Sequence, residues 1–593
     1  MPAFEKWPAD GSSWGEFSPL PLEKRPIPLM FERKRTFLRE MKIRSEDLES
    51  FSFAFEAKAI LAPGTKKVIE LDASELTTGY LTIKTFGGTG SRISIQYAES
   101  YTLPPVVQHP VKGIRDDCGN FKLEGYEDIY LPSGNYDTYE PFWFRTFRFV
   151  RLEVEVGEEQ LIIFKPCYHE TGYPLEVISY IESDEKWIKQ LWDVSIRTLQ
   201  RCMHETYEDC PYYEQMQYTL DTRLEALFTY MVSGDTRLAL KALEDFRCSM
   251  TPEGILQSRA PSDEPNIIPV FSLYWIFMLE DYYWQSGDAS IIKRYRNSVD
   301  TILDWFDSKI GPYGLTEKYL YWEFIDWVDE WRDSNGSANA VHPASNKGPT
   351  ATNNLIYAAA LKSAANLSQI TGRTQLAGEY MLRAQAILEN VEKYCWNENA
   401  MMYQEGPEVE EFTQHAQAWA VLSGLAERER AAVILKNALD NKSVAGCTFV
   451  FSFFLFRALE TAGMYEITND LWDKWKDALC MNLTTWPEDL TGQRSDCHGW
   501  GSLPLYEFTR CILGVQPEEP GWRKIRIQPH CLSLPNASGK VITNVGIVEV
   551  EWEKTSEGFI IKGSVPQHIS CRLVLPDGST FEYPYGGLFK VQV

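Results

Sequence analysis

The sequence predicts a multidomain α+β protein in which a central (α/α)6 barrel, or toroid, lies between an N-terminal and a C-terminal antiparallel β-sandwich domain. The first observation is the hydrophobic period. It is close to 2 from about residue 51, changes to 3.6 at about residue 183, and returns to 2 after about residue 514. The second is an alternation of tight and long connections between the helical segments. A chain of 593 residues also has room for roughly two to four domains.

The N-terminal part of the chain is predicted to contain a lead-in and a first β-domain. Residues 1–50 are rich in Pro, Arg, Lys and Glu and have no clear hydrophobic period. We therefore expect an extended lead-in that lies across the surface of other domains. Short alternating runs follow and predict a β-sandwich over residues 51–182. Residues 80–86 and 91–97 are two such runs, separated by the glycine-rich residues 87–90. This spacing predicts a β-hairpin.

The helical period continues over residues 183–514, and this range is expected to form the (α/α)6 barrel. The predicted helical segments are 184–204, 217–233, 235–249, 268–286, 288–309, 349–371, 373–396, 412–425, 426–439, 448–464, 465–479 and 501–513. Five connections are tight and carry a glycine where a helix C-terminus needs a left-handed residue. These glycines are Gly234, Gly287, Gly372, Gly424 and Gly463.

The connections that alternate with the tight turns are long, except the one near residues 440–447. They span residues 205–216, 250–267, 310–348, 397–411 and 480–500. All tight turns therefore lie at one end of the helices, and the long loops share the opposite rim. Six helical hairpins arranged in this way form a toroid whose cavity opens at the long-loop end, where function is usually carried.

The period of 2 returns in residues 515–593, which predict a second and smaller β-sandwich. Residues 546–552 and 558–562 are strand runs separated by a polar turn.

Composition and charge restrict the possible partners. A net charge of −25 without a basic stripe argues against nucleic acid, anionic membranes and polyanionic substrates. The 19 Trp, 30 Tyr and 30 Phe exceed what a core needs, and the surplus suits a carbohydrate surface. A neutral ligand therefore fits best, and the oligomeric state stays open.

The cysteines and the N-terminus indicate no cofactor, metal or membrane anchor. The twelve cysteines are scattered without a CxxC pair. Cys497-His498 and Cys167-Tyr168-His169 lack the partner spacing of a zinc site, so we interpret them as packing residues. Residues 1–7 contain no apolar leader segment, and no membrane-spanning run follows. We expect a cytoplasmic protein, or a periplasmic one whose leader has been removed.

Residues 208–221 are the stretch around which the chain is organised. They form a loop running into a helix and contain four carboxylates, three tyrosines and almost no aliphatic side chain. A connecting loop has no structural need for this mixture. A sugar site does, because acids exchange protons and bind hydroxyls while aromatic faces cover the apolar side of the ring. The alternative is an acidic first helix turn favoured by the helix dipole.

Two further long loops carry unusual chemistry. The third contains Glu323, Asp326 and several tryptophans, including Trp327. The sixth contains Trp486, Glu488, Asp489, Asp496 and His498. Paired carboxylates beside aromatic rings are the minimum apparatus for glycoside hydrolysis, which needs a protonated acid for the leaving oxygen and an ionised group to activate water. The tryptophans could equally pack beneath the loop, and His498 could be a structural histidine.

Several motifs in order resemble a known family. They are Asp209-Cys210-Pro211 followed by an acid and Tyr218-Thr219-Leu220-Asp221, Phe147-Arg148-Phe149-Val150, Phe324-Ile325-Asp326-Trp327, Cys497-His498-Gly499-Trp500, and Leu513-Gly514-Val515 with Pro520-Gly521-Trp522. Over residues 51–593 the chain resembles the bacterial α-L-rhamnosidases of glycoside hydrolase family 78. The resemblance implies an inverting enzyme that releases terminal α-L-rhamnose from a glycoside or plant-polysaccharide side chain.

The resemblance also implies roles for individual residues. By position, Glu214 is the general acid and Glu488 the general base. Should Glu488 lie outside the pocket, its neighbours Asp489 and Asp496 are the next candidates for the base. The implied substrate-binding residues are Asp209, Tyr218, Asp221, Asp326, Trp327, Trp486 and His498. The commonest family motif has Gln-Arg-Asp-Glu-Arg after the proline, whereas residues 212–215 here are Tyr-Tyr-Glu-Gln and the spacing is one residue shorter. Glu214 is still the only carboxylate between Asp209 and Asp221.

Alternatives stay open at this point. The same fold could cleave another neutral sugar or act as a phosphorylase or lyase. A phosphorylase needs a basic phosphate pocket where Glu488 stands. A carbohydrate-binding protein without turnover would be expected to lack Glu214 or Glu488, and both are present.

The mechanism implies two electrostatic and geometric expectations. Burial among tyrosines and the nearby Asp209 and Asp221 should raise the pKa of Glu214. Glu214 and Glu488 come from the first and sixth loops, which are neighbours in a closed ring. We expect their carboxyl groups to stand about 6.5–9.5 Å apart, as in inverting enzymes.

Overall fold

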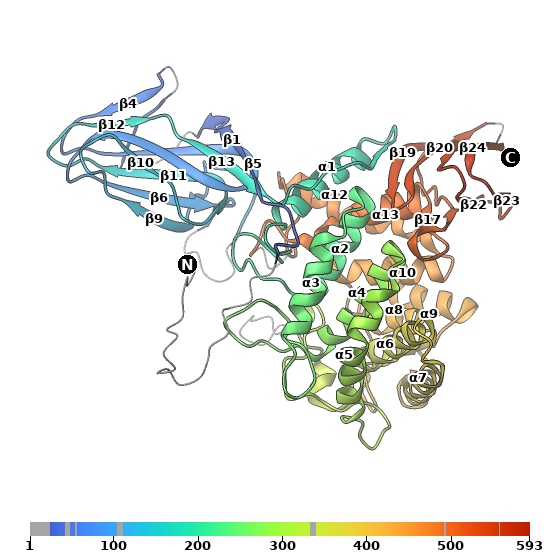
Figure 1. Cartoon of the computed structure of the whole chain (residues 1–593). Helices are drawn as coiled ribbons and strands as arrows, with labels where there is room; N and C mark the ends of the chain where they lie inside the picture. Colours follow the sequence, from blue (N-terminus) through green and yellow to red (C-terminus); the bar gives the residue numbers. More distant parts are fainter. Residues whose placement is uncertain are drawn as a thin grey trace, which may run out of the picture.

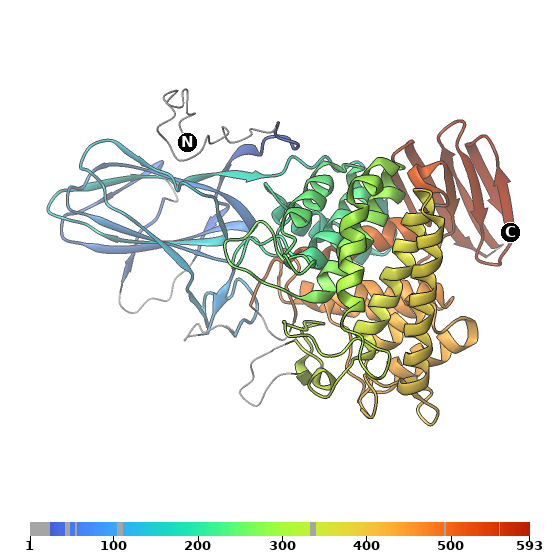
Figure 2. The same cartoon turned by 60° about the horizontal axis from the view of Figure 1, so that its bottom comes forward.

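The computed structural model describes residues 24–41, 48–53, 56–103, 111–331, 340–490, 494–556 and 558–593. The chain forms two β-domains on opposite sides of a helical domain, and the three follow one another in sequence order (Figures 1 and 2). The predicted order of N-terminal sheets, helical hairpins and C-terminal sheets is confirmed.

One long strand, β5, belongs to both sheets of the N-terminal domain. The first sheet has the order β1-β13-β5-β11-β6-β9, and β2 and β3 also pair with β5. In the second sheet, β10 and β12 pair with the end of β5, and β4 pairs with β12. Apolar side chains such as Leu81, Ile95 and Leu152 form one core in this domain. The bounds are β1 Phe31–Thr36, β2 Arg39–Glu40, β3 Glu49–Ser50, β4 Lys58–Leu61, β5 Lys66–Gly87, β6 Arg92–Ala98, β7 Tyr101–Thr102, β8 Lys122–Leu123, β9 Tyr126–Tyr130, β10 Asp137–Tyr139, β11 Arg145–Glu155, β12 Leu161–Phe164 and β13 Cys167–Gly172.

The predicted hairpin of residues 80–86 and 91–97 is wrong, because β11 lies between β5 and β6 in the first sheet. The end of β5 instead pairs with β10 and β12 in the second sheet. The glycine-rich turn therefore carries the chain from one sheet to the other, and the left-handed φ of +75° at Gly88 suits this reversal.

The described part of the lead-in also differs from the expectation. β1 pairs with β13 along its whole length, and β2 and β3 pair with β5. Residues 24–41 and 48–50 therefore contribute strands to the N-terminal domain. Backbone hydrogen bonds of an available sheet satisfy the chain better than an extended run over other domains would. The rest of the predicted lead-in lies outside the described residues.

The helical domain is a ring in two layers. Helices α2, α4, α6, α8 and α10 contact one another in order, and α13 contacts α2. Their bounds are α1 Lys186–Arg201, α2 Thr219–Ser233, α3 Arg237–Cys248, α4 Pro269–Ser286, α5 Ala289–Asp307, α6 Ala351–Ile370, α7 Thr374–Cys395, α8 Gln414–Leu422, α9 Arg428–Asp440, α10 Phe449–Thr461, α11 Thr468–Leu471, α12 Asp473–Cys480 and α13 Leu503–Glu507. The inner helices are apolar on most sides, which is the pattern of a helix buried all round.

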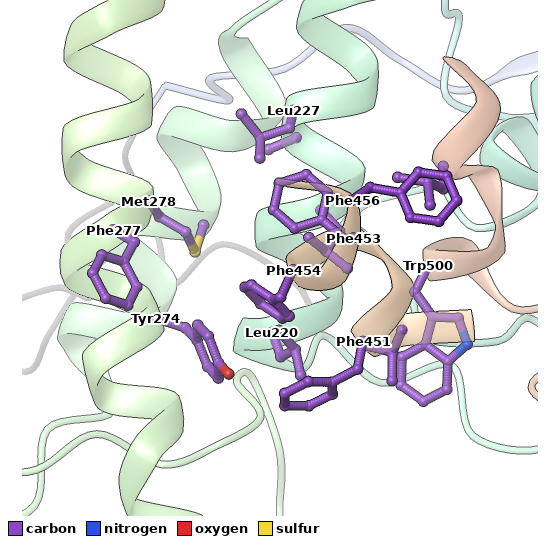
Figure 3. Close-up of a cluster of buried hydrophobic side chains, with 14 of the residues drawn as sticks. Leu220, Leu227, Tyr274, Phe277, Met278, Phe451, Phe453, Phe454, Phe456 and Trp500 are labelled. Carbon is purple, nitrogen blue, oxygen red and sulfur yellow. The ribbon is translucent and has the colours of Figure 1, made fainter. Parts of the chain in front are cut away.

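Aromatic side chains fill the centre of the ring. Figure 3 shows Tyr274 and Phe277 of α4 on one side of this cluster and Phe451 and Phe454 of α10 on the other. The Tyr274 and Phe454 rings are stacked with their centres 5.6 Å apart. This packed layer forms a rigid support for the loops at the rim.

The predicted helix ends are largely confirmed. All five glycines of the tight turns have a left-handed φ between 70° and 79°. Two predicted segments are divided: residues 465–479 form a 3-10 turn followed by α11 and α12, and residues 501–513 contain α13 followed by a π-helical turn, Phe508–Ile512.

The C-terminal domain has two sheets, with orders β14-β19-β20-β21-β24 and β17-β18-β22-β23. Its strands are β14 Tyr180–Glu182, β17 Val515–Pro517, β18 Lys524–Ile527, β19 Asn536–Thr543, β20 Gly546–Thr555, β21 Gly558–Val565, β22 Ser570–Val574, β23 Thr580–Tyr583 and β24 Gly587–Gln592. Two details depart from the prediction. β14 lies in the range expected for the first domain, and β18 pairs with β22 in parallel. The parallel pair is possible because β19 to β21 form the long crossover between these strands.

In the part of the chain that the structure describes, no helix combines the length and the apolar character needed to cross a bilayer.

Candidate active site

The first long loop, between α1 and α2, forms a closed turn that presents Glu214. The backbone N–H of Asp209 donates to the carbonyl of Met216 at 2.9 Å, and the Met216 N–H donates back to Asp209 Oδ1 at 2.9 Å. The Gln215 N–H donates to the Cys210 carbonyl at 2.9 Å, and Gln215 has a left-handed φ of 56°. These bonds fix the loop on both sides of Glu214.

Glu214 has two side-chain partners in this structure. Its Oε1 accepts a 2.6 Å hydrogen bond from Arg494 Nη1, and its Oε2 accepts a 3.0 Å bond from the Tyr218 hydroxyl. Arg259 Nη1 in turn donates to the Tyr218 oxygen at 3.0 Å. The Glu214 side chain keeps 23% of its surface exposed, so a ligand can reach it.

The sixth loop folds back on itself. The His498 N–H donates to the Trp486 carbonyl at 2.8 Å, and the Glu488 N–H donates to the Ser495 carbonyl at 3.1 Å. The Trp500 indole donates to the Glu488 carbonyl at 3.1 Å. These bonds hold Glu488 and His498 on one short segment of the loop.

The first and sixth loops are neighbours, as the closed ring predicts. The Gly499 N–H donates to the Asp209 carbonyl at 3.0 Å. Arg494 Nη1 lies 2.6 Å from Glu214 Oε1 and 4.0 Å from Glu488 Oε2. These two oxygens can therefore be no farther apart than the sum of the two distances, with the guanidinium beside both.

The environment of Glu214 lowers its pKa, which is opposite to the expectation from the sequence. Burial favours the neutral acid, but the hydrogen bond and charge of Arg494 outweigh it, and the bond from Tyr218 acts in the same direction. The rise in the pKa of Glu214 was expected from aromatic shielding and neighbouring carboxylates alone, and no cation was considered. Glu214 is therefore ionised while Arg494 is bound to it.

Glu488 and Asp209 have the opposite environment. Burial raises the pKa of Glu488, against the opposing charges of His498 and Arg494. Burial also raises the pKa of Asp209 well above its ordinary value, and the charge of Glu214 acts in the same direction. Burial is the largest cause for both residues, and of these three acids only Glu214 has a cation hydrogen-bonded directly to it that outweighs burial.

Asp221 and His498 form a buried pair between the two loops. Asp221 lies in the first turn of α2, and its Oδ1 lies 3.1 Å from His498 Nε2. The His498 ring also packs against Trp500, with the ring centres 3.8 Å apart. Burial disfavours the imidazolium, but Asp221 and the charge of Glu488 raise the pKa of His498 above its ordinary value. The surroundings of His498 therefore favour its protonated form, next to the acidic side chains of both loops.

Tyr218 and Trp327 lie on one chain of edge-to-face aromatic rings. The ring centres are 6.5 Å apart between Tyr218 and Phe271, 5.8 Å between Phe271 and Phe324, and 5.3 Å between Phe324 and Trp327. Trp327 is half-buried, which leaves part of its ring available as a wall. The third loop is thus connected to the first through aromatic contacts.

Asp326 has a different role from the predicted sugar contact. Its side chain is fully buried, with Oδ2 2.7 Å from His415 Nε2 and 2.9 Å from the Thr448 N–H. Its Oδ1 accepts from the Trp327 N–H at 2.8 Å and from the Thr448 hydroxyl. Both oxygens are occupied by the protein, so Asp326 fastens the third loop to α8 and to the start of α10.

Trp486 is likewise directed away from the predicted site. It is fully buried, its indole donates to Ser195 Oγ at 2.7 Å, and its backbone N–H donates to Thr198 Oγ1 at 2.9 Å. It anchors the sixth loop on α1. The sequence could not distinguish this orientation, because an apolar ring beside a proline suits a pocket wall and a core equally.

Asp496, a reserve candidate for the general base, is also structural. Arg115 Nε and Lys112 Nζ of the N-terminal domain lie 3.0 Å and 3.3 Å from its oxygens. Burial opposes ionisation, but these two cations hold the pKa of Asp496 below its ordinary value. This ion pair joins the N-terminal domain to the sixth loop. The other reserve candidate, Asp489, is buried beside Glu488.

Arg494 lies beside both predicted catalytic acids, and the sequence did not predict it as a site residue. It is the only Lys or Arg in residues 205–221 and 481–509 together, which carry all the candidate carboxylates except Asp326. The family motif usually has two arginines beside its acid, and this chain has none there. A charge balance over the two loops would have indicated Arg494.

A metal could in principle meet three ligand atoms in this site. One ligand atom each from Asp209, Cys210 and His498 lies within 4.8 Å of the others, and all three residues are buried. The set fits a metal poorly, because His498 Nε2 is bound to Asp221 and burial raises the pKa of the Cys210 thiol, which opposes the thiolate that a metal requires. All twelve cysteines of the chain are free thiols.

Comparisons with known proteins cover most of the chain. A family model described as the bacterial α-L-rhamnosidase six-hairpin glycosidase domain matches residues 176–510, more than half of the chain. A second, described as the bacterial α-L-rhamnosidase C-terminal domain, matches residues 514–583. A curated α-L-rhamnosidase from Alteromonas sp. (strain LOR) is 32% identical over 136 residues, which are 22% of this chain and 14% of that protein.

Solved structures share the architecture. A family 78 rhamnosidase of Bacillus sp. GL1 matches with a TM-score of 0.77 and 24% identity, over 88% of this chain and 54% of its own. A rhamnosidase from Klebsiella oxytoca with rhamnose bound matches with a TM-score of 0.69 and 16% identity, over 82% of this chain and 96% of its own. The chain thus spans about half of the Bacillus protein and a small part of the Alteromonas protein.

Proposed function

The chain belongs to the bacterial α-L-rhamnosidase family with a six-hairpin glycosidase domain, and on this premise we propose that it is a glycoside hydrolase that releases terminal α-L-rhamnose from a neutral glycoside or plant-polysaccharide side chain. The observation that carries the proposal is the meeting of Glu214 and Glu488 on either side of Arg494, where the first and sixth loops touch. Two acids from adjacent loops supply the pair that glycoside hydrolysis needs.

In the proposed reaction, Glu214 protonates the leaving glycosidic oxygen and Glu488 removes a proton from the attacking water. Asp209, Asp221 and His498 would bind the hydroxyls of the sugar from beneath, while Tyr218 and Trp327 would cover its apolar face. The partial exposure of Glu214 supports the first role, because the glycosidic oxygen must come within hydrogen-bond reach of the acid.

Arg494 explains how an ionised Glu214 can become the acid. A sugar bound between the two carboxylates would take the space beside Glu214 and separate it from Arg494. The loss of this cation, in a site from which water is then excluded, raises the pKa of Glu214 and lets it carry a proton. The released guanidinium stays close to Glu488 and favours the ionised form that a base requires.

We propose single displacement with inversion. Inverting enzymes hold a sugar and a water between acids about 6.5–9.5 Å apart, and retaining enzymes hold them about 5–5.5 Å apart. The distances from Arg494 set only an upper limit on the separation of the nearest oxygens of Glu214 and Glu488, and this limit lies at the lower end of the inverting range. Withdrawal of the bridging guanidinium leaves room for the water.

The proposed substrate is a rhamnoside because the Klebsiella oxytoca relative was solved with rhamnose bound and a Streptomyces avermitilis relative was solved with L-rhamnose. The test is a panel of aryl glycosides that includes the α-L-rhamnoside. We expect hydrolysis of the α-L-rhamnoside without added phosphate. Activity on a different aryl glycoside alone would contradict the sugar, a need for phosphate would indicate a phosphorylase, and binding without turnover would indicate a carbohydrate-binding protein.

A further inference from the structure

A cavity of about 290 Å³ lies where the N-terminal domain meets the first long loop. The N-terminal domain contributes Glu99, Ser100 and Thr102 to its lining, and the first loop contributes Tyr212 and Tyr213. The lining of the cavity therefore comes from two domains, and the proposed reaction uses none of these side chains.

The contact between the domains is built around Tyr212. Its hydroxyl donates to the Tyr97 carbonyl at 2.8 Å and accepts from the Tyr126 N–H at 3.2 Å. The Tyr126 ring, from the edge strand β9, lies 4.9 Å from the Tyr212 ring. A Cβ at Gly125 would come within 2.7 Å of the Tyr212 hydroxyl, so this approach requires glycine. The edge of the sheet is thus fitted to the loop and gives the cavity rigid aromatic walls.

The cavity has a direct structural link to the proposed acid. Tyr213 lines the cavity and precedes Glu214 in the chain. The Arg494 guanidinium carbon lies 4.8 Å from the centre of the Tyr213 ring, and its Nη1 binds Glu214. The side chains proposed to hold the rhamnose, such as Asp221 and His498, do not line the cavity. Because Tyr213 and Glu214 are adjacent, a leaving group that continues from the oxygen protonated by Glu214 can extend toward the cavity.

Several polar atoms of the cavity lining have no protein partner. Among the described residues, Glu99 Oε1, Ser100 Oγ and Thr102 Oγ1 are buried without a hydrogen bond. Each of these side chains is more than nine-tenths buried. Buried polar groups normally have a partner, so three such atoms in residues that line one cavity favour a ligand that brings hydroxyl groups to them.

The charges of the lining favour a neutral ligand. Lys112 Nζ lies 3.2 Å from Glu99 Oε2 and donates to the Arg494 carbonyl at 2.7 Å, so its charge is already matched within the protein. Glu124, which also lines the cavity, would repel a carboxylate group on a ligand. A neutral hexose or pentose meets these conditions better than a uronic acid does.

We propose that this cavity is the subsite for the sugar to which the terminal rhamnose is attached, and that this sugar is neutral. The proposal rests on the proposed α-L-rhamnosidase function. It gives the N-terminal domain a direct part in substrate choice, through Ser100, Thr102 and the tyrosines of the interface.

The test compares hydrolysis of α-L-rhamnosyl-glucose with hydrolysis of an aryl α-L-rhamnoside, which has no second sugar. Thr102→Val and Ser100→Ala each remove a hydroxyl that has no hydrogen-bond partner in the described parts of the chain, so both variants should keep the melting temperature of the parent. In each, the ratio of kcat/KM for the disaccharide to that for the aryl substrate should fall by about twofold to tenfold, the value of one neutral hydrogen bond. The parent should also prefer α-L-rhamnosyl-glucose to α-L-rhamnosyl-glucuronic acid.

Thr77→Val is the matched control. Thr77 is a buried threonine of the same domain whose hydroxyl has no partner among the described residues, and it does not line the cavity. The ratio of its kcat/KM for the disaccharide to that for the aryl substrate should equal the ratio of the parent. An unchanged ratio in Thr102→Val and Ser100→Ala, with good activity on the aryl substrate, would overturn the subsite and leave the proposed function intact. A preference for the glucuronic acid substrate would overturn the neutral sugar. Inactivity of the parent on every rhamnoside would overturn the function and the subsite together.

Discussion

Arg494 Nη1 donates a 2.6 Å hydrogen bond to Glu214 Oε1, although the two residues are 280 positions apart in the chain. This bond joins the sixth loop to the first and keeps the proposed acid ionised in the free enzyme. The same guanidinium lies 4.0 Å from Glu488. The Arg494 charge therefore acts on both proposed catalytic groups, and in the proposed reaction it changes partner when a sugar is bound.

The first prediction concerns the pH dependence of kcat/KM. Arg494 lowers the pKa of Glu214, and the general acid acts only when it is protonated. Arg494→Gln should therefore move the basic limb of the kcat/KM profile to higher pH, because the free-enzyme pKa of Glu214 rises. Arg494→Lys is the matched control, since it keeps the charge. The basic limb of its kcat/KM profile should move less than that of Arg494→Gln. An identical basic limb in the parent and Arg494→Gln would contradict the assigned role of this contact.

The same pair gives a prediction about folding. A carboxylate whose folded pKa lies below its unfolded pKa stabilises the protein above the unfolded pKa, and this stabilisation is lost as the pH falls through the folded pKa. Arg494→Gln should therefore lower the melting temperature at neutral pH relative to the parent. The difference should shrink as the pH falls through the folded pKa of Glu214. Thermal unfolding of both proteins across this pH range measures the difference in melting temperature. A difference that grew on acidification would contradict the prediction.

A third prediction concerns the leaving group. Glu214→Gln should retain sugar binding and lose about 10²- to 10⁴-fold in kcat on a sugar leaving group, which needs a proton. The loss should be much smaller on a nitrophenyl leaving group. Glu488→Gln is the informative comparison, because loss of a base should lower both rates alike. Equal losses on both substrates for Glu214→Gln would count against Glu214 as the acid.

The fourth prediction is the stereochemical outcome. With Glu488 as base and a single displacement, the first sugar released from an α-L-rhamnoside should have the β configuration. Proton NMR of the fresh hydrolysate, before the anomers equilibrate, decides this. Initial release of the α-anomer would contradict single displacement and indicate a mechanism with a covalent glycosyl-enzyme.

The fifth prediction separates structural from substrate-binding residues. Asp326 binds His415 and Thr448 inside the protein, so Asp326→Ala should leave buried donors without their partner and cost about 1–3 kcal/mol of stability for each. Thr448→Ala keeps the His415 contact and should cost less. Chemical denaturation measures both. A stable Asp326→Ala variant whose KM alone is raised would restore Asp326 to the substrate site.

The sequence by itself determined the order of domains and the plan of the barrel. Helical periodicity is created by contacts three and four residues apart, and the tight turns depend on a glycine at one position, so both can be found without tertiary information. Gly234 and Gly287 end α2 and α4 in the left-handed conformation that their position predicts. The alternation of tight and long connections then required the first and sixth loops to meet.

Only the tertiary structure decided which side chains face the site and how they are charged. Trp486 and Asp326 have the residue types of a sugar pocket, yet both point into the barrel wall, because their orientation depends on partners such as Ser195 and His415 from other hairpins. The pKa of Glu214 was predicted with the wrong sign for the same reason. Electrostatic effects grow steeply at short distance, so the nearest charge decides, and ring closure brought Arg494 to that place.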